Sequence, residues 1–404
     1  MESLVQTHQV IEHLYIHVPF CLNKCQYCSF YSESTQISEN NEEIKYYLLA
    51  LEREIRYYQQ LFDFQLKTVY FGGGTPSLLT PEQMSTILNV ILKKSGVHTT
   101  ELLFDNIPKS DEIEITLECN PNTINDEKLA RLKHSGINRI SMGVQSFNNQ
   151  ILQYLGRIHD SDIAENAIKS VKRAGFKNFS VDLIYGIPDQ SKAMFLSDIN
   201  KCVEYQVPHI SFYGLSLDEE VPLYRDLKKL PNEDEVCEQY YSAQKILENQ
   251  QYLPYEISNF ALEGFHSRHN MAYWQGKTYL AAGPSASGYL KACNRDMKYL
   301  RYTNSSDLKK YKDKWLINVH QDFEQVEMIN QEEAEKEFII TRLRLKDGIQ
   351  LKEYQENFLK DFSIVYQKQI KKLVKADLIH VTDQSLCIKR EHYLLMNEII
   401  LEFI

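Results

Sequence analysis

The sequence predicts an α/β fold in which parallel strands and helices alternate to form an incomplete barrel. Three observations lead to this prediction. Six short runs rich in β-branched residues alternate with longer amphipathic runs between residues 13 and 217. The short runs are almost continuously apolar, as in strands that are covered by helices. The unusual residues follow these strands at their carboxyl ends, where α/β proteins bind ligands.

The predicted elements follow one another in a regular order. The strands are residues 13–19, 68–74, 114–121, 139–146, 178–188 and 209–217. Apolar residues at helical spacing predict helices at 44–62, 81–94, 126–136 and 161–175, and the last two should end at Gly136 and Gly175 in left-handed C-caps. Because helices connect the strands, the strands should be parallel with right-handed crossovers. Six units are too few for a closed eight-unit barrel, which leaves an open sheet or a partial barrel.

The alternation of strands and helices fades after residue 220, which predicts three parts. Residues 1–220 form the partial barrel. Residues 221–325 extend it with a helix at 233–250 and the segment HNMAYW. Residues 326–404 form a small, mainly helical C-terminal domain that is similar to a winged helix, with a wing and a helix within 381–400.

The composition is that of an ordinary globular protein. Among 404 residues, 43% are hydrophobic and 25% are charged. The net charge of −10 argues against nucleic acid as a partner, and the basic stretch at 371–380 is best explained as a solvated helix face. No window approaches the roughly 18 to 20 apolar residues of a membrane span, and the N-terminus lacks the pattern of a signal peptide. We therefore expect a cytoplasmic protein without stable membrane insertion.

Three of the eight cysteines cluster in FCLNKCQYCSF, directly after the first strand. In a reducing cytosol such a cluster indicates metal binding or redox chemistry. Cys21, Cys25 and Cys28, spaced C-x3-C-x2-C, suit three corners of a four-iron four-sulfur cluster and leave the fourth iron without a protein ligand. Zinc is the rival, but a structural zinc takes four ligands. A fourth ligand from His17 or from a distant cysteine stays open, and the other five cysteines are expected to be small buried hydrophobes.

Two further sets of residues follow the later strands. The segment GGGTP at 72–76 would let the backbone approach a ligand closely. Glu118, Gln145 and Asp182 suit ribose hydroxyls or an ammonium group, and Arg157 suits a carboxylate. Each of these side chains alone would more often make a structural hydrogen bond. Together at one sheet edge they indicate a site for a polar ligand.

The cysteine spacing, with the aromatic Tyr27 before the last cysteine, resembles the radical S-adenosylmethionine (radical SAM) superfamily. The resemblance implies a [4Fe-4S] cluster on Cys21, Cys25 and Cys28 and an electron donor as a partner. In that superfamily S-adenosylmethionine chelates the open iron through its amino and carboxylate groups, and electron transfer from the cluster releases a 5′-deoxyadenosyl radical. The superfamily also implies a partial (β/α)6 barrel, which agrees with the strand count.

A closer resemblance involves YIHVPFC, FGGGTP, LECNP, MGVQSF, LGRIH and DLIYGIP, in this order along the chain. This set is similar to the oxygen-independent coproporphyrinogen III dehydrogenases (oxidases) and their relatives, and YEISNF with RHNMAYW extends the similarity to residue 274. The branch implies an S-adenosylmethionine site made of Tyr15, Gly73, Gly74, Thr75, Glu118, Gln145, Arg157, Asp182 and Gly214.

Two functions compete within that branch. The dehydrogenases, which oxidatively decarboxylate coproporphyrinogen III to protoporphyrinogen IX, carry another cysteine two positions after the third and a longer N-terminal extension. Here that position is Phe30, and only twenty residues precede Cys21. The pattern C-x3-C-x2-C-x-F and the segment H-N-x-x-Y-W are instead typical of the heme chaperones called HemW. That resemblance implies a protein that binds heme and transfers it to acceptor hemoproteins, with coproporphyrinogen oxidation as the alternative.

The heme chaperone resemblance assigns heme contacts to four residues, which are His269, Asn270, Tyr273 and Trp274. An imidazole ligates heme iron axially, and aromatic rings stack on a porphyrin. From the segment alone, residues that cap a turn and fill a core are the simpler interpretation. Relatives usually show G-P-x-A-H-S after this segment, whereas this chain has Ser287 in place of the histidine. Any role of that histidine in binding metal or heme is therefore absent here.

Overall fold

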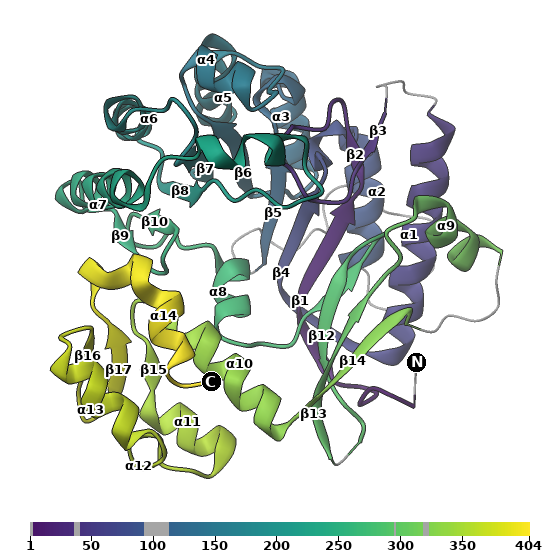
Figure 1. Cartoon of the computed structure of the whole chain (residues 1–404). Helices are drawn as coiled ribbons and strands as arrows, with labels where there is room; N and C mark the ends of the chain where they lie inside the picture. The colour runs from purple at the N-terminus through teal and green to yellow at the C-terminus, as the bar shows by residue number, and fades with distance from the viewer. Residues whose placement is uncertain (1–2, 36–40, 93–112, 295, 318–322) are drawn as a thin grey trace.

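The computed structural model describes residues 3–35, 41–92, 113–294, 296–317 and 323–404. Its largest element is a nine-stranded sheet with the order β11-β1-β4-β5-β6-β7-β8-β10-β9 (Figure 1). The six central strands are mutually parallel. They are β1 (Val10–Val18), β4 (Asp63–Gly73), β5 (Glu114–Cys119), β6 (Arg139–Gln145), β7 (Asn178–Tyr185) and β8 (His209–Gly214). The predicted α/β fold with six parallel strands is confirmed.

The two edges of this sheet do not pair with each other, so the barrel stays open. One edge is β11 (Leu280–Ala282), parallel to β1, and the other is formed by β10 (Asn259–Ala261) and β9 (Leu253–Pro254), with β10 antiparallel to β8. The short helix α8 (Arg268–Trp274) lies against β4. The Glu114 carboxylate of β5 accepts hydrogen bonds from the first two backbone N–H groups of α8. This contact places α8 on the inner side of the sheet.

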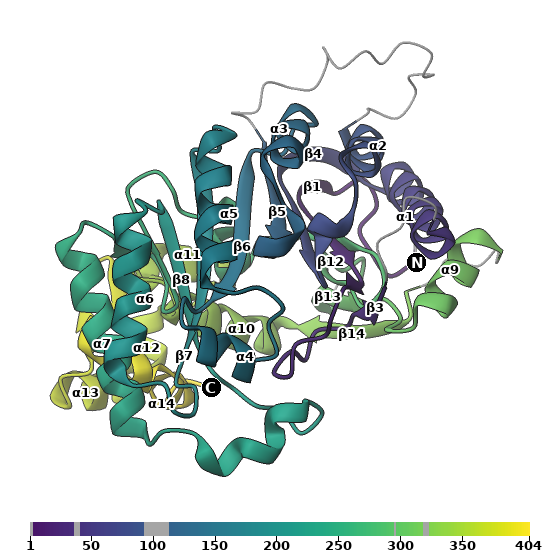
Figure 2. The same ribbon diagram turned by 90° about the horizontal axis from the view of Figure 1, so that it is seen from above.

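Helices cover the outer side of the curved sheet (Figure 2). They are α1 (Glu42–Leu61), α2 (Pro81–Leu92), α3 (Asp126–His134), α5 (Ser161–Arg173), α6 (Lys192–Glu204) and α7 (Glu233–Asn249), and a short α4 (Asn149–Tyr154) follows β6. The predicted helices are confirmed within two residues at each end, except that residues 93–94 lie outside the described residues. Gly136 and Gly175 follow α3 and α5 with φ of 103° and 79°, which confirms the two left-handed C-caps.

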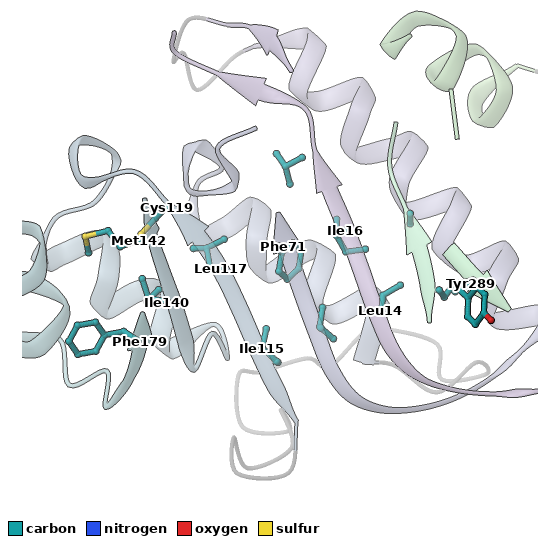
Figure 3. Packing of buried hydrophobic residues seen from close by; sticks show 14 of the residues in the cluster. Leu14, Ile16, Phe71, Ile115, Leu117, Cys119, Ile140, Met142, Phe179 and Tyr289 are labelled. Atoms are coloured by element: carbon teal, nitrogen blue, oxygen red, sulfur yellow. The ribbon is translucent and has the colours of Figure 1, made fainter. Parts of the chain in front are cut away.

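The hydrophobic core lies between the sheet and these outer helices (Figure 3). Leu14, Phe71, Leu117 and Ile140 point outward and are fully buried. Their neighbours along each strand point inward and are mostly polar, because successive side chains of a strand face opposite sides. The sequence analysis expected strands that are apolar on both faces because helices cover them. In the structure both faces are buried, but only the face toward the helices is apolar.

The remaining elements build two small antiparallel sheets with helices. One sheet contains β12 (Ser287–Lys291), β13 (Met297–Thr303) and β14 (Gln325–Asn330), and the helix α9 (Leu308–Leu316) between them packs on α1. The other contains β15 (Ile349–Gln350), β17 (Ser385–Ile388) and β16 (Ile379–Val381), surrounded by α10 (Gln331–Leu343), α11 (Leu351–Phe358), α12 (Phe362–Val365), α13 (Gln367–Lys375) and α14 (Met396–Leu401). Pairing of β13 with β14 crosses the predicted limit at residue 325. No described helix is both long and apolar enough to span a membrane.

Candidate functional site

The carboxyl ends of the central strands open into a cavity of about 480 Å³, which we call the barrel cavity. It collects nearly all of the residues that the sequence assigned to a cluster and to S-adenosylmethionine. These lining residues are Cys21, Cys25, Cys28, Gly73, Gly74, Thr75, Glu118, Gln145, Arg157, Asp182 and Gly214. Tyr15 is the exception: it lies beneath the cavity, where its ring stacks on Tyr70 with the ring centres 6.2 Å apart.

The three clustered cysteines follow β1: Cys21 ends the short strand β2 (Phe20–Cys21), and Cys25 and Cys28 lie on the loop between β2 and β3 (Glu33–Ser34). All three are free thiols, and a hydrogen bond of 3.2 Å from Cys28 N to Cys25 O closes the turn between the last two. Among the described residues no three His, Cys, Asp or Glu side chains converge as they would on a single metal ion. Because each cysteine of a four-iron cluster ligates a different iron, the sulfurs need not converge on one point. Three thiols on the wall of one cavity therefore fit such a cluster.

The sequence left a fourth ligand open, and the two candidates differ in their placement. Both ring nitrogens of His17 are engaged, Nε2 with the Tyr31 carbonyl oxygen at 2.9 Å and Nδ1 with the Tyr15 hydroxyl at 3.2 Å. His17 does not line the barrel cavity, whereas the buried Cys119 does. Burial raises the pKa of the Cys119 thiol, which keeps this sulfur protonated while no metal is near it.

The glycine segment is pressed against the cysteine loop. Gly73 has φ of 106°, and Gly74 N donates to Val18 O at 2.8 Å. A Cβ on Gly74 would stand 2.6 Å from the backbone oxygen of Phe20, so only glycine fits this position without a shift. By contrast, a Cβ on Gly214 would make an ordinary contact of 3.4 Å. Gly73 is thus required by its backbone conformation and Gly74 by the lack of space, whereas neither reason applies to Gly214.

Two partly buried carboxyl groups face the barrel cavity. Glu118 accepts hydrogen bonds from the Tyr70 hydroxyl at 2.7 Å and from Gly73 N at 3.2 Å, and burial raises its pKa to about 7. Asp182 accepts from the Ser141 hydroxyl at 3.0 Å, and burial raises its pKa as well. A ligand with N–H or O–H donors, above all a cationic ammonium group, would therefore stabilise the charged form of both carboxyl groups.

Arg157 reaches the cavity from the turn after α4, whereas Glu118, Gln145 and Asp182 reach it from strands. Its guanidinium donates to Cys25 Sγ at 3.2 Å, to Asn120 Oδ1 at 2.6 Å and to Gly143 O at 2.6 Å. The β6–β7 register shifts between Gly143 and Gln145, and Gln145 has φ of 70°. Such a bulge turns a side chain away from the regular direction of its strand, and bulges are frequent beside active sites.

His269, one of the four residues expected to contact heme, lines neither the barrel cavity nor the second cavity described below. Its side chain is 1% exposed, and both ring nitrogens are engaged. Nδ1 lies 2.7 Å from the Thr68 hydroxyl and Nε2 lies 2.9 Å from the Tyr273 hydroxyl, while the ring stacks on Tyr70. Burial lowers the pKa of His269 to about 3, so the ring is neutral.

A second cavity of about 560 Å³, which we call the aromatic cavity, lies between α8, the β12–β13 pair and α10. Its wall contains the aromatic side chains Tyr273, Trp274, Tyr279, Tyr289, Tyr299, Phe338 and Phe358. It also contains five basic residues, which are Lys277, Lys291, Lys298, Arg301 and Arg342, and two acidic ones, Glu337 and Glu353.

The four residues expected to contact heme are therefore not brought together. Tyr273 and Trp274 line the aromatic cavity, Asn270 lines the barrel cavity and His269 is enclosed between them. Because α8 lies between the two cavities, its side chains are divided between them although the four positions span only about 140° of the helix circumference. Ser287 lines neither cavity, and its hydroxyl donates to Tyr302 O at 3.1 Å.

Comparisons with known proteins agree with this architecture. Residues 15–202 match the radical SAM superfamily, and residues 329–395 match the HemN C-terminal domain. The heme chaperone HemW of Lactococcus lactis is 32% identical over 385 residues, which covers 92% of this chain and 93% of the relative. HemW of Bacillus subtilis is 30% identical over 95% of this chain and 97% of the relative, and HemW of Escherichia coli is 34% identical over 72% and 73%.

The chain belongs to the HemW family of radical SAM proteins. Among solved structures, coproporphyrinogen III oxidase (HemN) from Escherichia coli matches 98% of this chain and 90% of its own, with a TM-score of 0.78 and 21% identity. At that identity the match shows that the HemW-family chain shares the fold. The predicted partial radical SAM barrel with a helical C-terminal region is confirmed.

The structure of this HemW-family chain adds residues to the site that the sequence analysis missed. Asn120 accepts from Arg157 and donates to the Thr75 hydroxyl at 3.0 Å, so it joins two predicted residues. It stands in the segment ECNP beside Glu118, where its polar side chain was a usable signal. Arg139 and His209 also line the barrel cavity, but each begins a strand, and nothing in the spacing distinguishes them from surface residues.

Proposed function

We propose that this HemW-family protein is a cytoplasmic heme chaperone, which binds heme and transfers it to acceptor hemoproteins. The observation that carries the proposal is the near end-to-end similarity to relatives named heme chaperone HemW. Phe30, in the position where the dehydrogenases have a further cysteine, supports a chaperone over a coproporphyrinogen dehydrogenase.

In this proposal the barrel cavity holds the [4Fe-4S] cluster on Cys21, Cys25 and Cys28, together with S-adenosylmethionine. The bound cluster would supply an electron to S-adenosylmethionine, and an electron donor would replenish it. Arg157 suits the carboxylate of the methionine part because its guanidinium already faces Cys25. Glu118, with its raised pKa, suits an ammonium group that restores a buried carboxylate to its charged form.

For heme we propose the aromatic cavity, with Tyr273 and Trp274 against the porphyrin plane. Aromatic rings stack on a porphyrin, and cations pair with its propionates. Five basic against two acidic lining residues make this cavity locally positive in a protein of net charge −10. His269 then serves to position Tyr273 through their hydrogen bond, and the iron ligand is not assigned to it.

One anaerobic experiment tests the proposal against its alternative. The cluster is reconstituted, and the protein is then titrated with heme, mixed with an apo-hemoprotein, and assayed with coproporphyrinogen III and S-adenosylmethionine. The proposal expects saturable heme binding, transfer to the apo-hemoprotein and no protoporphyrinogen IX. Formation of protoporphyrinogen without heme retention would assign the protein to the dehydrogenases instead.

The proposed heme position has its own test. Trp274→Ala should weaken heme binding about tenfold, because the variant loses a stacked ring and its buried area. Tyr46→Ala removes an exposed aromatic ring from α1, outside the aromatic cavity, and should leave heme affinity unchanged. Equal affinities of the two variants would place heme outside the aromatic cavity.

A further inference from the structure

The inner surface of the barrel is polar down to the starts of β6 and β8. Five side chains show this: Arg139 and Ser141 from β6, Ser180 from β7, and His209 and Ser211 from β8 all line the barrel cavity and are at most 6% exposed. In β/α barrels such positions are usually filled by large branched apolar residues. Here the apolar residues point outward instead (Figure 3). Ser180 donates to Ser141 at 2.9 Å and Ser141 donates to Asp182 at 3.0 Å, so part of this polar interior is satisfied internally, and the question is which groups are not.

Arg139 is the most unusual of these residues. Its side chain is 1% exposed, and it makes no hydrogen bond and no ion pair with any residue that the structure describes; its Nε is buried without a partner. The carboxyl groups of Glu118 and Asp182, which Arg139 influences from a distance, are bonded to other partners. Burial of a guanidinium ion is strongly unfavourable unless hydrogen-bond acceptors surround it.

His209 adds a second group without a full set of partners. Its Nε2 lies 2.8 Å from the Tyr255 hydroxyl, whereas its Nδ1 is buried and unpartnered. Burial and the charge of Arg139 lower the pKa of His209, so the ring is neutral. When the tyrosine hydroxyl donates to Nε2, Nδ1 carries the proton and becomes a donor. Ser211, 2% exposed and on the same strand, lies beside Asp182, and its hydroxyl bonds that carboxyl group.

Arg139 and His209 begin β6 and β8, at the opposite end of these strands from the mouth of the cavity. Arg139 precedes Gly143 by four residues and Gln145 by six along β6. By strand register Glu118 lies level with Ser141 and Asp182 level with Gly143, so at about 3.3 Å per residue the Cα of Arg139 lies roughly 7 Å below that of Glu118 and roughly 13 Å below that of Asp182. Arg139 and His209 therefore enter the cavity from below the residues assigned to S-adenosylmethionine, whereas Ser211 lies level with one of them, Asp182.

We propose that the deep end of the barrel cavity binds a carboxylate, with Arg139 as its two-pronged anchor and His209 as a further donor. The planar fork of arginine matches the two oxygens of a carboxylate, and the ion would supply the acceptors that the buried guanidinium lacks. This site goes beyond the proposed function, because it does not depend on heme in the aromatic cavity. The carboxylate comes from a small free acid or from the propionate side chain of a larger molecule.

Fluorine NMR of the full-length protein without cofactors, at constant ionic strength, tests the site with trifluoropropanoate as the probe. We expect saturable broadening of the probe signal with the wild type and none with the neutral trifluoropropanamide. Arg139→Met keeps an unbranched apolar stem and removes a buried charge, so it should fold and bind the probe at least tenfold more weakly. Arg131→Met, an exposed change on α3, should bind like the wild type. Unchanged binding by Arg139→Met, or equal binding of the amide, would overturn the proposal.

Two additions keep the test decisive. If Arg139→Met does not fold, Arg139→Lys retains the charge without the fork and should bind severalfold more weakly; equal affinity would refute the two-pronged contact. If succinate displaces the probe, the site takes a small free acid. If iron coproporphyrin displaces the probe and succinate and iron octaethylporphyrin do not, the site takes a propionate side chain. Displacement by S-adenosylmethionine would assign the contact to that cofactor and overturn the proposal. Heme transfer without probe binding refutes this inference alone, whereas probe binding without heme binding refutes the proposed function alone.

Discussion

The raised pKa of Glu118 makes the stability of the cofactor-free protein depend on pH. The carboxyl group has a pKa of about 7 in the folded chain against an ordinary value of 4.5. Between these values the unfolded chain binds fewer protons than the folded chain, so the free energy of unfolding falls as pH rises, and the loss is complete above the folded pKa. With these two pKa values, this group lowers the free energy of unfolding by about 2.5 kcal/mol between about pH 5 and pH 8.

Glu118→Gln cannot ionise and lacks this contribution. Its amide oxygen still accepts from the Tyr70 hydroxyl, and loss of the second hydrogen bond, from Gly73 N, costs about 1 kcal/mol at every pH. Relative to the wild type, the variant should therefore gain about 2.5 kcal/mol from pH 5 to pH 8 in urea unfolding followed by circular dichroism. Glu127→Gln, a change at a side chain that is 82% exposed, serves as the control. A difference between Glu118→Gln and wild type that does not change with pH would refute a buried, protonated carboxyl group.

Three further changes test other parts of the structure. Cys25→Ser should lose most of the iron bound after reconstitution, measured per chain, while Cys293→Ser at an exposed cysteine should retain it. Gly74→Ala places a Cβ 2.6 Å from a backbone oxygen and should lower the free energy of unfolding by about 1 to 3 kcal/mol, whereas Gly214→Ala should be close to neutral. Leu117→Ala in the outer core should cost about 2 to 5 kcal/mol in denaturant unfolding, without changing the affinity of the folded protein for heme.

The strands and the cysteine loop could be predicted because their signals are local. A β-branched run between turn residues predicts a strand whatever lies around it, and all six predicted strands appear in the structure. The cofactor residues could be grouped because the carboxyl ends of parallel strands meet at one edge. The side on which each apolar residue lies was not predicted, because both faces of these strands are buried and burial alone does not distinguish them.

The errors concern residues whose position depends on the packing of distant segments. Arg157 lies in a turn, and only the packing of α4 against the cysteine loop brings it to Cys25. The segment HNMAYW was expected to form one heme site, but α8 is inserted between two cavities, so its successive side chains are divided among them. Arg139 was not singled out, because its burial results from how distant segments fold around the inner side of the sheet.

The separation of apolar and polar residues on the two faces of the barrel strands has a consequence for how the chain tolerates substitution. Along β6, Ile140, Met142 and Val144 support the outer core, and the intervening residues face the cavity. The effects of successive substitutions along this strand should therefore alternate: one position lowers the thermal stability and the next weakens ligand binding. Neighbouring positions can then change independently: the outer face can acquire a more stable packing without altering what the barrel holds, and the inner face can acquire a new ligand without loosening the fold.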